Sequence, residues 1–275
     1  MNGFILCFTR FALSLQMMKK YVLDLKVVGC ERLGDRYALL RLTADDCLPE
    51  MQPGQFAELR VDGSPNTFLR RPISIHYLDR TRNEVWFLVA MVGEGTSRLG
   101  SLRMGDVLNC IIPLGNGFTL PDSPQERVLL IGGGVGVAPL LFLGAQLRQI
   151  GCEPTFLLGA RKASDLVELD LFQSQGRVLL TTEDGSVGEK GFVTGHSVLV
   201  SEEFDRICTC GPKPMMMAVA KLAAARGITC EVSLENVMAC GLGACLCCVE
   251  PTKKGNVCVC KEGPVLNINQ LLWPI

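Results

Sequence analysis

The hydrophobic pattern of residues 19–122 is a series of short runs rich in branched and aromatic residues. Gly, Pro, Asp and Asn separate the runs, which lie at 21–29, 37–43, 55–61, 73–78, 84–92 and 106–112. No long helical period interrupts them. Short, regularly spaced strands with turn signals between them are typical of a small antiparallel barrel or sandwich. We therefore predict an antiparallel β-barrel over residues 19–122.

A second pattern follows the Pro-rich stretch near residues 120–124. Apolar strands alternate with helical stretches, as a parallel sheet flanked by helices requires, at 128–131, 154–158, 178–182 and 206–210. This alternation predicts an α/β domain over residues 123–229. Ligands of such sheets bind at the carboxyl ends of the strands, so the residues that follow each strand are candidate contacts.

The first of these strands runs into a glycine turn. Residues 132–139 read Gly-Gly-Gly-Val-Gly-Val-Ala-Pro, and a helix is predicted from there to about residue 150. Such a turn brings backbone N–H groups and a helix N-terminus to a phosphate, although a tight structural turn explains the same sequence. We take Gly132, Gly134 and Gly136 as candidate nucleotide contacts.

Acidic residues follow the strand at 178–182. Glu183 and Asp184 have no neighbouring Arg before Lys190, and they would repel a 2′-phosphate. They therefore favour NAD over NADP, unless they belong only to a solvated turn.

The third pattern is a concentration of cysteine. Seven of the 14 cysteines follow residue 229, and Cys240, Cys245 and Cys248 give C-x4-C-x2-C with a distant fourth Cys. This is the plant-type spacing of a two-iron cluster. The fourth ligand is Cys258 or Cys260, which spacing alone does not decide. A zinc site would usually add a second C-x2-C or histidines, and both histidines lie far upstream. We predict an iron–sulfur subdomain over residues 230–275.

Composition narrows the function classes. The chain has 27 basic and 28 acidic residues, so nothing indicates nucleic acid or a polybasic membrane surface as partner. Fourteen cysteines in 275 residues are too few for a disulfide scaffold and fit a reducing compartment, the cytoplasm. Residues 1–18 are apolar but too short to span a bilayer, and we expect an N-terminal extension outside the fold.

Two polar stretches stand out within the predicted barrel. Arg71 and Ser74 offer a guanidinium and a hydroxyl to a pyrophosphate or a flavin edge, and Gly95 and Thr96 allow a close backbone approach to an anion. The alternative is ordinary: an Arg-Pro pair entering an edge strand, then a glycine hairpin.

These motifs, in this order, resemble the ferredoxin–NADP reductase superfamily. They are Arg71-Pro-Ile-Ser with Gly95-Thr, the glycine turn at 132–139, and Cys210-Gly-Pro-Lys-Pro-Met. The C-terminal cysteine cluster narrows the resemblance to the family of electron transfer subunits of dihydroorotate dehydrogenase B. The stretches 233–241 and 260–265 are especially similar to that family.

The resemblance implies a set of site residues. It implies FAD contacts at Arg71, Pro72, Ile73, Ser74, Leu88, Val89, Ala90, Gly95 and Thr96. It places Cys210 near the junction of nicotinamide and flavin, and it makes Cys240, Cys245, Cys248 and Cys260 the cluster ligands. Ile73 departs from the pattern, because many members of the superfamily have an aromatic residue there.

The resemblance also implies a function. The chain would carry electrons from a catalytic, FMN-containing dihydroorotate dehydrogenase subunit through a 2Fe-2S cluster and FAD to NAD+, in pyrimidine synthesis, within a heterotetramer of two plus two subunits. No residue of this chain is expected to act as acid or base on dihydroorotate. One alternative is a redox subunit of a related hydrogenase, sulfite reductase or ferredoxin–NAD(P) oxidoreductase. Another is a zinc-stabilised nucleotide-binding regulator.

Overall fold

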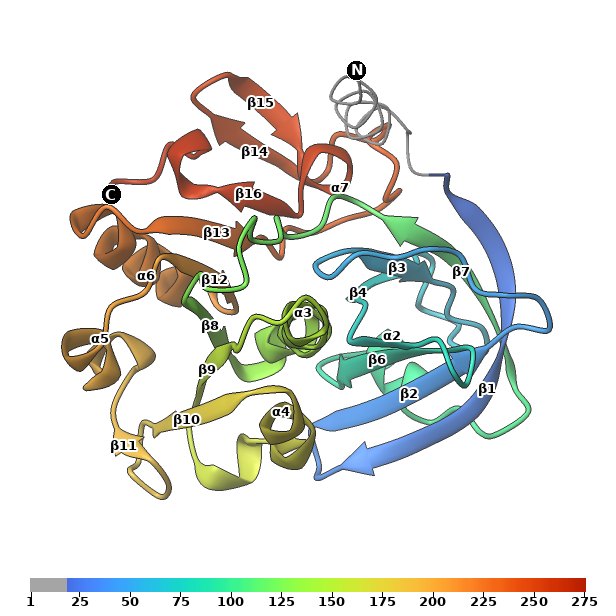
Figure 1. Ribbon diagram of the computed structural model, residues 1–275. Coiled ribbons are helices and arrows are strands. Elements are labelled where there is room, and N and C mark those ends of the chain that lie inside the picture. Colours follow the sequence, from blue (N-terminus) through green and yellow to red (C-terminus); the bar gives the residue numbers. More distant parts are fainter. Residues whose placement is uncertain (1–18) are drawn as a thin grey trace, which may run out of the picture.

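The computed structural model describes residues 19–275, so the predicted extension at 1–18 lies outside the described residues. The first half forms a curled antiparallel sheet of order β4-β3-β7-β1-β2-β6-β5 (Figure 1). Its strands are β1 (Tyr21–Leu33), β2 (Tyr37–Thr43), β3 (Phe56–Leu59), β4 (Arg71–Ser74), β5 (Tyr77–Asp79), β6 (Glu84–Ala90) and β7 (Val107–Leu114). The short helix α2 (Glu94–Leu99) follows β6.

The predicted strand at 73–78 is two strands, because the chain changes partner there. β4 pairs with β3, whereas β5 pairs with β6. At the break, the Ile75 N–H donates to the Gln55 carbonyl and the His76 N–H donates to the Trp86 carbonyl. The chain therefore crosses from one edge of the sheet to the other within two residues, which curls the sheet.

The second sheet has the order β11-β10-β9-β8-β12-β13-β16. All its pairs are parallel except β13 with β16. The strands are β8 (Val128–Gly133), β9 (Thr155–Ala160), β10 (Arg177–Thr182), β11 (Glu189–Lys190), β12 (Arg206–Cys210), β13 (Thr229–Ser233) and β16 (Val265–Asn267). The helices between them are α3 (Ala138–Gln149), α4 (Leu169–Gln175), α5 (Val198–Ser201) and α6 (Lys213–Ala225).

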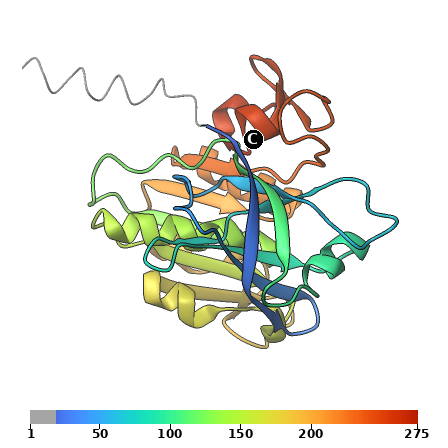
Figure 2. The same ribbon diagram turned by 90° about the vertical axis from the view of Figure 1, so that its right-hand side faces the viewer.

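The cysteine-rich segment forms a small unit on top of this sheet. It contains the hairpin β14 (Val249–Thr252) and β15 (Gly255–Cys258), then α7 (Val259–Glu262), and it returns to the sheet through β16. Figures 1 and 2 show this unit in red above the other two. The proposed boundary at residue 229 stays a prediction, although β13 and β16 both belong to the second sheet.

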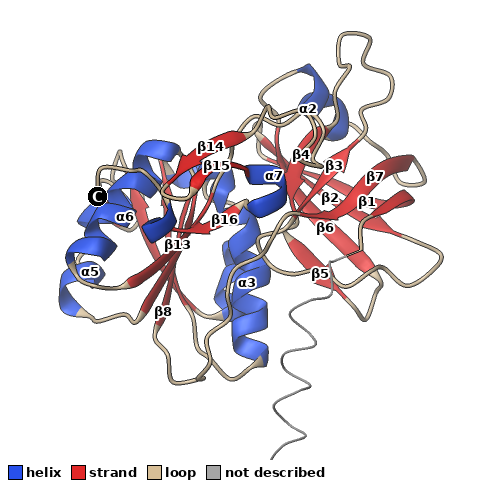
Figure 3. Cartoon of the chain, turned by 90° about the horizontal axis from the view of Figure 1, so that it is seen from above, coloured by secondary structure: helices blue, strands red, loops and turns tan. Residues whose placement is uncertain are grey.

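Helix α3 lies between the curled sheet and the parallel sheet (Figure 3). It is apolar nearly all round, with eight buried residues, because it packs against a sheet on either side. Phe142 on α3 belongs to the hydrophobic core of the barrel, while Leu140 belongs to the core beneath the parallel sheet. The predicted fold class, an antiparallel barrel followed by a parallel α/β domain and a C-terminal cluster unit, is confirmed.

Candidate cofactor sites

The carboxyl ends of β8 and β12 meet at the point where the strand order reverses. The chain runs from β8 outwards to β9 and β10, then returns to β12 on the other side of β8. The predicted glycine turn follows β8, and Gly211 follows β12. A Cβ at Gly136 would lie 2.4 Å from the Gly211 Cα, so only glycine permits the two loops to meet. Such a switch point is where open α/β sheets bind their ligands.

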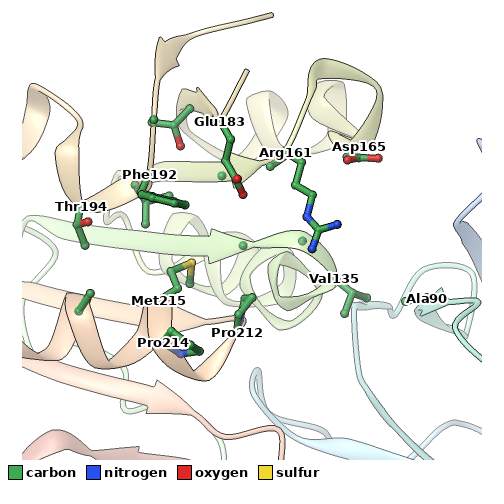
Figure 4. A pocket seen from close by; sticks show the side chains of 18 of the residues that line it. Ala90, Val135, Arg161, Asp165, Glu183, Phe192, Thr194, Pro212, Pro214 and Met215 are labelled. Carbon is green, nitrogen blue, oxygen red and sulfur yellow. The ribbon is translucent and has the colours of Figure 1, made fainter. Parts of the chain in front are cut away.

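A cavity of about 620 Å³ opens at this switch point and reaches the barrel. Its size is within the usual range for a small-molecule or cofactor site. Figure 4 shows residues from both sheets around it. Its walls are Gly133, Gly134, Val135, Gly159, Ala160, Arg161, Asp165, Thr181, Glu183, Gly191, Phe192, Val193, Thr194, Pro212, Pro214, Met215, Ala218 and Glu235 from the second half, with Arg36, Tyr37, Ala90 and Val92 from the barrel.

The predicted nucleotide residues divide into three groups. Gly134 and Glu183 line the cavity. Gly132 and Gly136 lie behind it, where they permit the turn to pack closely. Asp184 accepts hydrogen bonds from the Ser186 hydroxyl and N–H at 2.6 and 2.9 Å, and these bonds lower the pKa of the Asp184 carboxyl. Asp184 therefore stabilises the turn itself.

Cys210 lies buried behind the cavity, next to Glu235. Its Sγ donates to Glu235 Oε1 at 3.8 Å. Burial raises the pKa of the Cys210 thiol well above its ordinary value, and burial also raises the pKa of the Glu235 carboxyl. A thiol held neutral is a poor nucleophile. Cys210 is thus placed to shape the wall, while the carboxyl of Glu235 lines the cavity.

Sequence reasoning missed several cavity residues. Arg161 follows β9 and enters the same cavity as Glu183, so an arginine is close in space although none is close in sequence (Figure 4). Glu235 and Phe192 were also missed. The signal that could have identified Arg161 is its position directly after β9, because residues at the carboxyl ends of parallel strands are candidate ligand contacts. The sequence prediction named such residues only after β8, β10 and β12.

The two barrel motifs lie side by side. The side chains of Arg71, Pro72, Ile73 and Ser74 are all half-buried on β4. A Cβ at Gly95 would lie 2.9 Å from Arg71 Nε, so the guanidinium lies directly against the glycine of the second motif. The Thr96 hydroxyl accepts from the Gly93 N–H at 3.1 Å, which fixes that loop. Guanidinium and backbone groups are thus gathered where a pyrophosphate would need donors.

The remaining predicted flavin contacts lie on β6. Ala90 lines the cavity. Leu88 and Val89 are at most 1% exposed and belong to the hydrophobic cores, so neither side chain is open to a ligand. These assignments stay predictions. Arg70, next to the motif, has a structural role, because it donates to the Asn109 and Glu58 carbonyls at 2.9 and 3.3 Å.

The four predicted cluster cysteines come from two segments, the loop at 240–248 and the start of α7. The segments meet where the Cys260 N–H donates to Cys248 Sγ at 3.4 Å. Within residues 19–275, no three Cys, His, Asp or Glu side chains are placed as ligands of one metal ion. A two-iron cluster takes two protein ligands on each iron, so four cysteines supply its full set.

Backbone N–H groups point at these sulfurs. Leu242 donates to Cys240 Sγ at 3.3 Å, Gly243 donates to Cys260 Sγ at 3.1 Å, and Cys260 donates to Cys248 Sγ at 3.4 Å. The Leu242 N–H is the main reason that the pKa of Cys240 falls to about 6. Hydrogen bonds of this kind favour the thiolate, the form that binds metal.

The Cys260 thiol depends more strongly than the Cys240 thiol on a bound metal to lose its proton. It is fully buried, and burial raises the pKa of its thiol to about 12. Iron would displace this proton, since metal ligands bind deprotonated. The rival Cys258 lies at the end of β15, and its Sγ contacts the Gly243 carbonyl at 3.8 Å. The residues present therefore fit a two-iron cluster.

The loop that carries Cys240 touches the barrel. Gly241 has φ +66°, and a Cβ there would lie 2.7 Å from Glu58 Cγ. Glu58 is on β3, directly opposite Pro72 of the flavin motif. Its side chain is fully buried, and neither carboxylate oxygen has a hydrogen-bond partner among the described residues. Burial raises the pKa of Glu58 to about 7.

Comparison with known proteins agrees with this arrangement. Residues 235–272 match the iron–sulfur cluster binding domain of dihydroorotate dehydrogenase B. The solved structure of an NADH-dependent reduced ferredoxin–NADP oxidoreductase superimposes with a TM-score of 0.80 and 27% identity, covering 90% of each chain. A ferredoxin reductase of carbazole 1,9a-dioxygenase has the same fold, with a TM-score of 0.65 and 20% identity over 77% of this chain and 68% of that one.

Curated relatives cover nearly the whole chain. The dihydroorotate dehydrogenase B (NAD(+)) electron transfer subunit of Desulforamulus reducens is 38% identical over 92% of this chain and 98% of its own. The subunit of the same name from Shouchella clausii is 39% identical over 80% of this chain and 86% of its own. The resemblance seen in the sequence is therefore confirmed, and the chain belongs to the family of dihydroorotate dehydrogenase B electron transfer subunits.

Proposed function

We propose that the chain is the electron transfer subunit of an NAD-linked dihydroorotate dehydrogenase. It would bind FAD at β4 and the Gly95 loop, NAD in the cavity, and a 2Fe-2S cluster on Cys240, Cys245, Cys248 and Cys260. A flavin exchanges a hydride with nicotinamide and single electrons with an iron–sulfur cluster, so the flavin must lie between the two.

The arrangement of the three sites is the observation that carries this proposal. On one side, Glu58 joins the flavin strand to the cluster loop: it pairs with Pro72 and contacts Gly241. On the other side, Ala90 and Tyr37 of the barrel line the nucleotide cavity. The flavin motif is therefore flanked by the cluster loop and the nucleotide cavity, as the chemistry demands.

The partner would be a catalytic, FMN-containing subunit that oxidises dihydroorotate for pyrimidine synthesis, in an assembly of two plus two chains. No residue of this chain is assigned to that oxidation. No helix within residues 19–275 is long and apolar enough to cross a bilayer. We place the assembly in the cytoplasm, where the 14 cysteines would stay reduced.

One alternative has a specific observation in its favour. The solved NADH-dependent reduced ferredoxin–NADP oxidoreductase covers 90% of this chain. A chain of the present kind that served ferredoxin rather than dihydroorotate would keep all three cofactor sites and change only the partner surface.

Anaerobic co-purification tests the proposal. The tagged chain should retain FAD, iron and acid-labile sulfide, together with an FMN-containing partner, and the complex should reduce NAD+ with dihydroorotate. A complex that reduces NAD+ only with reduced ferredoxin would support the alternative. A colourless protein with stoichiometric zinc would overturn both and favour the regulator.

A further inference from the structure

A buried histidine of the barrel contacts the nucleotide-binding half. His76 lies between β4 and β5 and has no exposed surface. Its Nδ1 is 2.7 Å from the carbonyl oxygen of Ala138, the first residue of α3. Its Nε2 is 3.0 Å from Oε2 of Glu168, the residue just before α4. One imidazole ring is thus held at two points of the other half of the molecule.

Hydrogen-bond chemistry assigns the protons of this contact. A backbone carbonyl only accepts, so His76 Nδ1 must carry a hydrogen. Nε2 and Glu168 Oε2 would then be two bare acceptors 3.0 Å apart unless a proton lies between them. Both side chains are at most 5% exposed, and apart from this close approach His76 Nε2 and both Glu168 oxygens have no hydrogen-bond partner among the described residues. Because unpaired buried polar groups are expensive, the pair must share one proton.

The backbone at Glu168 indicates that this side chain is needed. Its φ is +57°, in the left-handed region, where glycine, asparagine or aspartate would be accommodated with less strain. A strained position occupied by a long acidic residue supports a specific role for its carboxyl group. Phe172 of α4 lies beside the histidine, with ring centroids 6.4 Å apart and the rings tilted by 59°.

The position of the pair relates it to both cofactor sites. His76 is two residues beyond Ser74 of the flavin motif, and Ala138 lies within the glycine turn at 132–139, directly after its last glycine-rich residues. Within residues 19–275, a second ion pair between these halves, Arg36 with Asp165 at 3.6 Å, lies nearer the surface, with Arg36 53% exposed. His76 is therefore a buried polar link between the strand of the predicted flavin motif and the glycine turn.

We propose that His76 and Glu168 are positioning residues: their proton-sharing contact sets the distance between flavin and nicotinamide. The proposal rests on the function inferred above. It concerns the nicotinamide side of the flavin only, and it leaves the cluster side unchanged.

Two substitutions of Glu168 distinguish the effect of its contact with His76 from the effect of its negative charge. Glu168→Gln removes the charge, but its amide N–H still reaches His76 Nε2 and donates to it. Glu168→Asp keeps the charge but is one methylene shorter, so the contact is lost. Aspartate also suits the left-handed backbone better than glutamate, so backbone strain does not penalise this variant.

The measurement is stopped-flow reduction of bound flavin by NADH in the anaerobic complex, with the long-wavelength charge-transfer absorption of stacked nicotinamide and flavin as a second signal. Glu168→Gln should stay within about twofold of the unmodified protein. Glu168→Asp should reduce flavin about 10- to 100-fold more slowly, the usual effect of a misplacement near 1 Å, and its charge-transfer band should weaken. FAD and iron contents should not change in either variant.

His76→Asn gives an independent test, because its amide replaces Nδ1 towards Ala138 and leaves Glu168 without a partner. It should behave like Glu168→Asp. Normal flavin reduction with a normal charge-transfer band in both Glu168→Asp and His76→Asn would overturn the proposal. Should unmodified protein lack FAD, or hold FAD that NADH never bleaches, the proposed function itself fails, which is a distinguishable result.

Discussion

The barrel meets its two neighbours in different ways. Towards the nucleotide half, the contact is made by side chains: a buried histidine and carboxylate, an ion pair, and apolar residues of α3. Towards the cluster unit, it is made largely by backbone. A Cβ at Gly115 would lie 2.5 Å from Pro264 Cδ, and Asn116 donates through N–H and Nδ2 to the carbonyls of Gly263 and Glu262.

This difference has consequences for substitution. A contact made by side chains accepts another side chain with the same hydrogen-bond capacity, as Glu168→Gln should show. A contact made by close backbones accepts no added atoms. The cluster side, where single electrons must pass, should therefore tolerate fewer substitutions, and the following predictions test that contrast.

Loss of the cluster should be the largest effect. Cys245→Ser should lower iron and acid-labile sulfide by more than about tenfold, because thiolates are the ligands of such clusters. FAD should remain bound, since its motif is on the barrel. Cys247→Ser is the matched control, because both cysteines are exposed on the same loop. Equal iron in the two variants would remove Cys245 from the ligand set.

Gly241→Ala should produce the next largest effect. The new Cβ would lie 2.7 Å from Glu58 Cγ and 2.9 Å from Leu114 Cδ1, and φ is +66°. Left-handed strain and overpacking together predict a loss of about 3–4 kcal/mol in the free energy of unfolding.

Gly243→Ala is the control, since φ is +80° there but the nearest neighbour is the flexible Lys261 chain at 3.1 Å. It should lose only about 1–2 kcal/mol. The comparison is made by thermal unfolding of the iron-loaded protein. Equal losses in the two variants would mean that the close approach of Gly241 to the Glu58 and Leu114 side chains contributes nothing.

Local pattern predicted most of the fold, because strand alternation and glycine turns are encoded within a few residues. The strand at 206–210 and the helix after the glycine turn begin and end close to where their sequences indicate. β13 and β16 were missed, since the antiparallel return of β16 depends on the cysteine unit folding over the sheet. The break at His76 was missed because it requires two partner strands that are distant in sequence.

The site residues, like the strands and helices, could be predicted only where a short local pattern marks them. The cysteine spacing and the Arg71 motif are short patterns that chemistry constrains, so they were visible in the sequence. The positions of Glu58, Arg161 and Glu168 depend on which strands become neighbours, which no local spacing indicates. The isolated carboxylate of Glu58 is the clearest example, because nothing around residue 58 in the sequence marks it as buried beside the cluster loop.

Glu58 also predicts a dependence of folding stability on pH. Its pKa is raised from 4.5 to about 7, so the unfolded carboxyl ionises before the folded one. Folding stability should therefore fall as pH rises from about 4.5 to about 7 and stay low above that. With allowance for solvent screening, the loss is about 2 kcal/mol.

Glu58→Gln should be more stable than the unmodified protein at pH 8 and should lack most of this slope. A slope that persists unchanged in the variant would assign it to other groups.

The smallest effect concerns the choice of nucleotide. From the sequence, Glu183 and Asp184 were predicted to act together as one acidic pair. In the structure, only Glu183 of the two lines the cavity, together with Arg161 (Figure 4). Glu183→Gln should lower the NADH over NADPH preference by about two- to fivefold, the range of a partly screened charge, because Arg161 would then face a 2′-phosphate without an opposing carboxylate.

Asp184→Asn should leave this ratio unchanged, since the Asp184 carboxylate is occupied by the Ser186 hydroxyl and N–H. The ratio of kcat/KM values for the two nucleotides, measured with an artificial acceptor, decides between them. An equal change in both variants would mean that the ribose lies over the turn rather than within the cavity. An unchanged ratio in both variants would mean that Glu183 and Asp184 form only a surface turn. Arg161 would then have a role other than facing the 2′-position of the nucleotide.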